Sequence, residues 1–224
     1  MPFKEFSKYI AEEENLVRTV FISLFTSFVV LAFLYFFKLK YIENFIPKYG
    51  FFIFFAILSH SLILPSVKHV KRYMEFQCMS GMMIGMTMGM ISGFLLGFYV
   101  GATNGMFVGS VFGMSVGMFF GIWNGKCCGI MGTLEGMMAG FMGGLMGAMT
   151  SLMMFNDNLK YMAVLVFIIS ASILIGLNYM IYRETREAEK TNKEGDFFIM
   201  FWSLFLTAIT IFIMVFGPRS VLFQ

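Results

Sequence analysis

Long apolar runs alternate with short charged or turn-rich connections along most of this chain. A helix of about 20 apolar residues crosses the ~30 Å hydrocarbon layer of a bilayer, and most of these runs reach that length. Connections are marked by residues that end helices, such as Pro65, or by charge clusters, such as 183–196. The pattern predicts seven transmembrane helices, at about 16–37, 50–64, 77–101, 104–123, 134–155, 159–182 and 197–216.

The two ends of the chain differ from this pattern. Within residues 1–15, apolar side chains recur three and four apart among charges, which predicts a short amphipathic helix at the membrane surface. A frayed polar terminus fits the same residues equally well. Val221–Gln224 is typical of the remnant that a viral 3C-type protease leaves, so we set 219–224 aside as a protease-site scar. The remaining residues, 16–217, read as a single transmembrane domain.

Glycine occupies every fourth position from Gly81 to Gly129, thirteen times in succession. No charged residue interrupts the fifty positions 76–125. That stretch is too long for one span and divides into two at 102–105, and a third glycine-rich span follows the break at 123–126. The sequence therefore predicts three glycine-rich helices within an all-α integral membrane protein.

A glycine costs a helix about 1 kcal/mol relative to alanine, so a long series of glycines needs a compensating gain. Between helices in lipid, that gain is close approach of the backbones. Four residues turn a helix by about 400°, so the stripe drifts about 40° per step and cannot follow one straight seam. We expect each glycine helix to touch more than one neighbour, within one chain or across a homo-oligomer axis, or else to wind around a partner in the right-handed sense. The packing positions are Gly85, Gly89, Gly93, Gly97, Gly109, Gly113, Gly117, Gly140 and Gly144.

Charge sets the expected orientation. With seven spans, eleven of the sixteen Lys and Arg residues fall on the side of the N-terminus. An excess of these residues marks the cytoplasmic side, so we expect the N-terminus inside and the C-terminus outside, in a cell inner membrane. Only 13% of residues are charged, against about 25% in soluble domains, and the net charge of +3 with no basic patch excludes nucleic acid.

Sulfur-containing side chains lie four apart on the glycine helices, so they share helix faces. Thioether and thiolate ligands select soft ions, Cu(I) above all. Three cysteines, two of them adjacent, make no disulfide framework, and in the seven-span topology they gather at the cytoplasmic edge of a thioether-lined core. The candidate metal ligands are Cys78, Met82, Met86, Met90, Cys127, Cys128, Met138, Met142 and Met146.

The local spacing of methionine and glycine resembles that of the Ctr-type copper transporters, whose helices carry an MxxxM ligand pair and a GxxxG packing pair. Met82 with Met86 and Gly81 with Gly85 have this spacing. The resemblance covers only these residues, and those proteins have three spans without a comparable glycine block. It implies handling of Cu(I) by the methionine pair.

Other interpretations of these residues remain open. Methionine is a flexible gap-filler that packs well beside glycine, so the ladders also fit packing alone. Glu135, near the start of the fifth span, is either a functional intramembrane carboxylate or an acid placed favourably at a helix start. His60, in the second span, either carries a proton, binds a metal ion, or is simply hydrogen-bonded to a neighbouring helix.

No enzyme motif is present: the chain has no HExxH, no nucleophile elbow and no phosphate-binding loop, so we do not expect an enzyme. The sequence favours a polytopic membrane protein that handles or transports a soft metal ion, with Cu(I) as the one expected cofactor. The alternative is a non-metal protein: a glycine-zipper scaffold, a subunit of a larger membrane complex or an oligomeric channel. The lipid bilayer is the first expected partner in either case.

Overall fold

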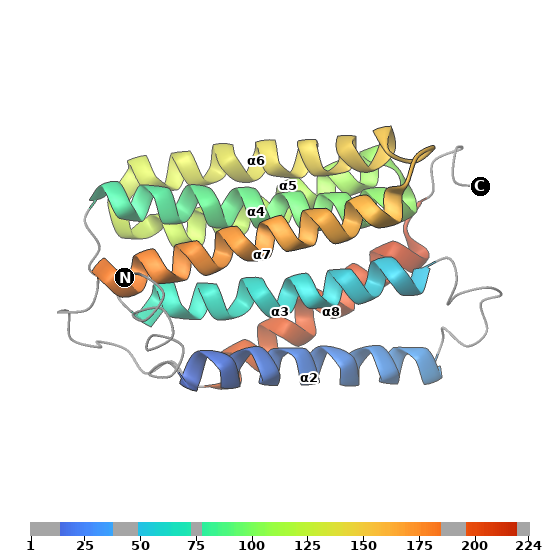
Figure 1. Cartoon of the computed structure of the whole chain (residues 1–224), viewed down its shortest axis with the longest axis horizontal. Coiled ribbons are helices and arrows are strands. Elements are labelled where there is room, and N and C mark those ends of the chain that lie inside the picture. Colours follow the sequence, from blue (N-terminus) through green and yellow to red (C-terminus); the bar gives the residue numbers. More distant parts are fainter. Residues whose placement is uncertain (1–13, 38–48, 73–77, 185–195, 219–224) are drawn as a thin grey trace.

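The computed structural model describes residues 14–37, 49–72, 78–184 and 196–218, and every regular element within them is helical (Figure 1). The expected N-terminal surface segment, apart from its last two residues, and the 219–224 scar lie outside the described residues. A short 3₁₀ turn, Lys126–Cys128, separates α5 from α6. The helices are α2 (Glu14–Phe37), α3 (Phe51–Arg72), α4 (Cys78–Asn104), α5 (Met106–Gly125), α6 (Gly129–Met153), α7 (Leu159–Glu184) and α8 (Asp196–Phe216).

The seven helices agree with the all-α architecture expected from sequence. Five of them, α3 to α7, contain apolar stretches long enough to cross a membrane. In α2 and α8 the apolar stretches among the described side chains are shorter, Val20–Phe33 and Phe201–Phe216. The chain is therefore an integral membrane protein that crosses the bilayer several times, and seven crossings stay a prediction.

Successive helices run up and down the bundle (Figure 1). The first residues of α2, α4, α6 and α8 lie at one end, together with the last residues of α3, α5 and α7. Arg72, Lys126 and Arg183 stand at or beside those helix ends. The basic residues at these helix ends thus share one end of the described bundle. That this side is cytoplasmic remains an expectation from charge.

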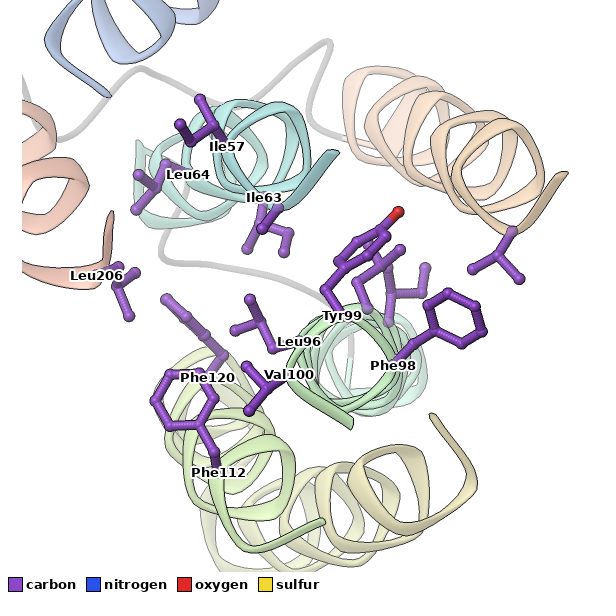
Figure 2. Packing of buried hydrophobic residues seen from close by; sticks show 14 of the residues in the cluster. Ile57, Ile63, Leu64, Leu96, Phe98, Tyr99, Val100, Phe112, Phe120 and Leu206 are labelled. Atoms are coloured by element: carbon purple, nitrogen blue, oxygen red, sulfur yellow. The ribbon is translucent and has the colours of Figure 1, made fainter. Parts of the chain in front are cut away.

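The glycine helices α4, α5 and α6 lie together on one side of the bundle, and α2, α3 and α8 lie on the other, with α7 beside α3 and α4 (Figure 1). Helix α4 is central, because it packs against α3, α5, α6, α7 and α8. Figure 2 shows the apolar core at this junction, where Leu96 of α4 lies with Ile63 of α3 and Phe120 of α5. The core proper is thus made of large side chains, and it adjoins the glycine helices through α4.

Two helix boundaries differ from the sequence prediction. Helix α3 does not stop at Pro65 but continues to Arg72. A proline removes one backbone N–H, and membrane helices tolerate this where neighbouring groups satisfy the backbone. Here the carbonyl that loses its helical donor is that of Ser61, and the Ser66 hydroxyl donates to the neighbouring carbonyl of Leu62 at 3.1 Å. Helix α6 begins at Gly129, earlier than the expected 134, because Gly129 adopts a φ of 68° that lets the chain turn directly into the helix.

Gly105 makes the sharp reversal between α4 and α5. Its φ is 108° and its ψ is 171°, a conformation that is essentially restricted to glycine. We expect Gly105→Ala to lower the free energy of unfolding by about 1–3 kcal/mol, measured by SDS titration in mixed micelles. Gly176→Ala, on α7 where an added Cβ meets nothing within 4 Å, is the matched control. Equal stability of the two variants would contradict a strained turn at Gly105.

Candidate functional site: the glycine core and its methionine ladders

The glycines of α4, α5 and α6 meet in layers. In the central layer, a Cβ added to Gly93 would lie 2.8 Å from the carbonyl oxygen of Gly140 and 3.2 Å from that of Gly113. A Cβ on Gly117 would lie 2.8 Å from both the Gly140 oxygen and the Gly93 Cα. Five such layers follow one register: Gly85–Gly125–Gly132, Gly89–Gly121–Gly136, Gly93–Gly117–Gly140, Gly97–Gly113–Gly144 and Gly101–Gly109–Ala148.

The layers explain the period of four residues. A stripe that drifts about 40° per step cannot stay on one partner along a straight seam, and here the glycines of each helix contact two partner helices. With two partners each, the three helices share one continuous backbone-to-backbone contact. The expected close-packed core of three Gly/Met-rich helices is therefore present, and it forms within one chain.

No passage runs along the axis of these three helices. The distances above leave no room for a single methyl group between the backbones, so an ion or a hydrated solute cannot pass there. The residues of the layers also offer no side-chain ligand, because they are glycine except for Ala148. The glycine core therefore serves to pack the three helices against one another.

The α6 methionine ladder stands outside this core. Met138, Met142 and Met146 are offset by two residues from the glycines at 136, 140 and 144, which places them on the opposite face of α6. They are 65%, 54% and 52% exposed. The structure thus puts these thioethers on the outer surface of the described bundle, not in the thioether-lined core that the sequence suggested.

A second line of small residues places the two ladders on adjacent helices. A Cβ on Gly143 of α6 would lie 3.0 Å from the Cα of Met90, and a Cβ on Gly147 would lie 3.0 Å from the Cα of Phe94. The backbone of α4 at Met90 and Phe94 therefore lies directly against α6. Met86 and Met90 are both 43% exposed, and Met82 is half-buried. The two ladders thus belong to the two helices that meet at the α4–α6 seam.

The predicted convergence of three thiols involves side chains outside the described residues. The side chains of Cys78 and Cys127 lie outside the described residues. Cys128, in the 3₁₀ turn, is half-buried, and a Cβ on Gly132 would lie 3.0 Å from its Cβ. Within the described part of the chain, no group of three or more His, Cys, Asp or Glu side chains is placed to hold a metal ion. Methionine is not one of these four residue types, so the ladders stay candidate ligands.

The two other candidate groups lie in different places. Glu135 is half-buried in the second turn of α6, on the same face as Gly143, which points toward α4. His60 is 1% exposed within α3, and its Nδ1 donates to the carbonyl oxygen of Ala56 at 2.6 Å. Its Nε2 has no hydrogen-bond partner among the described residues.

Sequence reasoning missed the polar contacts between helices. The Ser203 hydroxyl on α8 lies 2.8 Å from that of Ser27 on α2, and it donates to the backbone oxygen of Ser23 at 3.2 Å. Asn104, at the end of α4, donates to the carbonyl oxygen of Ile213 on α8 at 2.6 Å. Small polar residues inside apolar runs were the available signal, since such residues join membrane helices by hydrogen bonds.

The fold and site define a class: a polytopic helical membrane protein built on a close-packed glycine core. No protein-family model, curated protein or solved structure matches the chain. Its function is therefore argued from its own geometry.

Proposed function

We propose that the chain is a structural membrane protein, a rigid helical scaffold or subunit that holds a larger membrane assembly. The observation that carries the proposal is the set of five backbone-to-backbone layers joining α4, α5 and α6. Such layers contain no side chain that could change rotamer, and any sliding of one helix would bring backbone atoms into collision. A platform benefits from this rigidity, whereas a transporter must move its helices to alternate access.

Amide hydrogen exchange tests this proposal on the whole protein in nanodiscs. A rigid scaffold predicts that amides of α4, α5 and α6 exchange far more slowly than those of α2 and α8, and that added Cu(I) leaves the pattern unchanged. Exchange in the glycine helices as fast as in α2 would sink the proposal. So would a change in α4–α6 exchange on adding Cu(I), because it would mean that the core moves with the ion.

A second candidate function, soft-metal handling, is favoured by one specific observation. The Gly143 and Gly147 contacts hold α4 directly against α6, so the helices that carry the two ladders are neighbours along one seam. Successive methionines on one helix lie about one turn apart, so ligands for a single ion have to come from two helices. The seam supplies two such helices, and two or three thioethers in a water-poor surface suit Cu(I).

The combined variant Met138→Leu, Met142→Leu and Met146→Leu separates the two functions. These side chains are exposed and the exchange conserves volume, so we expect the free energy of unfolding to change by less than about 1.5 kcal/mol per site. If the seam binds Cu(I), the variant loses at least tenfold in affinity in a competition titration with a Cu(I) chelator. Elemental analysis of the purified protein gives the amount of copper bound before the titration. Equal Cu(I) binding by wild type and variant would exclude the α6 ladder as part of a Cu(I) site.

A further inference from the structure

An aromatic cluster joins the end of α5 to the first three turns of α8. It contains both tryptophans of the chain, Trp123 and Trp202, whose ring centroids lie 5.1 Å apart at an interplanar angle of 80°. The Phe119 ring of α5 contacts both, with centroid distances of 4.9 Å and 5.2 Å, and the Phe205 ring lies 5.9 Å from that of Trp202. Two helices that are far apart in the sequence thus build one aromatic surface.

This cluster lies at the edge of the apolar core and faces outward. The next residues along the chain, Phe120 and Leu206, belong to the core and are 2% and 5% exposed. Phe119 and Phe205 are 39% and 46% exposed, and the two tryptophans are half-buried. Tryptophan is enriched where membrane proteins meet the interface with water, because the indole ring has an apolar body and a polar N–H.

The position of the cluster along α5 fits that depth. Trp123 stands two residues before Gly125, where α5 ends, and the backbone stays helical at Lys126, with φ of −59° and ψ of −24°. Residues three and four apart lie on one helix face, so Phe119, Trp123 and Lys126 form one row. The row leads from the apolar part of α5 to an exposed ammonium group at the end of the bundle.

The charge on this face is positive. Helix α5 contains no charged residue, and the described side chains of α8, from residue 201 onward, include no carboxylate. Lys126 makes no ion pair with a described residue. An exposed ammonium group at the membrane surface attracts the headgroups of anionic lipids, and the apolar rings beside it suit an acyl chain.

We propose that Lys126 and the aromatic cluster form a binding surface for an anionic phospholipid. The Lys126 ammonium pairs with the headgroup phosphate, and the rings of α5 and α8 contact the upper part of the acyl chains. The lipid thereby bridges the end of the glycine core and α8. Neither the scaffold function nor Cu(I) handling requires this surface, so its test is independent of both.

Tryptophan fluorescence of the whole protein in liposomes tests the proposal, because both tryptophans of the chain lie in the cluster. Brominated lipids quench tryptophan on contact. Mixtures of phosphatidylglycerol and phosphatidylcholine, with bromine on one or the other, therefore give the relative affinity of the anionic and the zwitterionic lipid. One lysine near an anionic surface contributes about 1 kcal/mol, so we expect a preference of about fivefold for phosphatidylglycerol. In 1 M salt the preference should shrink toward unity.

Lys126→Gln should remove this preference while both lipids still quench, since the rings stay exposed. The matched control is Lys160→Gln, which changes an exposed lysine at the start of α7, at the opposite end of the bundle, and should keep the preference. Equal affinity for the two lipids in wild type, or a preference that survives Lys126→Gln, would overturn the proposal. Absence of quenching by either lipid would overturn it too, because a second copy or another protein would then cover the cluster.

Discussion

Gly93→Ala should destabilise the protein by about 3 kcal/mol, and Gly93→Leu should prevent it from folding. The added Cβ would lie 2.8 Å from the carbonyl oxygen of Gly140, 3.0 Å from the backbone nitrogen of Gly144 and 3.2 Å from the oxygen of Gly113. All three atoms belong to backbones, so no flexible side chain can move aside. The loss would appear in SDS titration of the purified protein as a lower midpoint at unchanged slope.

Gly176→Ala again provides the control for Gly93→Ala, since both glycines lie inside helices. At Gly176 nothing lies within 4 Å of the added methyl group, so better helix propensity should raise the stability by up to about 1 kcal/mol. Opposite signs for the two substitutions would establish that contact between helices, not helix propensity, decides the effect. If Gly93→Ala were as stable as wild type, the layered core would be wrong.

The layers also explain how much of the fold the sequence could predict. A four-residue glycine repeat has few uses other than close helix contact, so three packed helices follow from residues 81–147 alone. The up-and-down order follows from span length and from the distribution of Lys and Arg. The partners of each glycine do not follow, because the repeat looks the same at every step and many registers satisfy it. Only the structure shows that Gly93 pairs with Gly117 and Gly140.

The chemistry of the methionines was harder to predict for a related reason. Residues spaced by four share a face with each other, but the spacing does not say whether that face looks inward. Met138 and Gly140 are both members of four-residue series, and an offset of two residues puts them on opposite sides of α6. The glycines fix the inward face, so that offset was the usable signal. The two-residue offset favours contact with lipid or a surface site, and not a buried ion path, for Met138, Met142 and Met146.

Polar contacts divide the bundle into two kinds of interface. The α4–α6 side packs backbone to backbone through glycine, whereas α2 and α8 meet through hydroxyl groups. Ser203 accepts or donates hydrogen bonds with Ser23, Thr26 and Ser27, all through its single hydroxyl. Small side chains let the helices approach in both cases, but only the hydroxyl interface depends on directional bonds.

Ser203→Val should therefore separate α2 from α8, at a cost of about 2–5 kcal/mol. Loss of an interhelical hydrogen bond in a membrane protein costs about 0.6–1.7 kcal/mol, and the extra methyl group overpacks a fully buried position for about 1–3 kcal/mol more. Ser203→Ala removes the bonds without the added bulk and should cost about 1 kcal/mol. Both values come from the same SDS titration.

The control for Ser203→Val is Ser172→Val, because Ser172 is an exposed serine on the outer face of α7 and its change should stay within about 0.5 kcal/mol of wild type. Amide exchange locates the damage: in Ser203→Val, α2 and α8 should lose protection while α4, α5 and α6 keep theirs, since glycine layers and hydroxyl contacts are separate interfaces. Loss of protection across all helices at once would mean that the bundle unfolds as one unit, and that the glycine core is no independent platform.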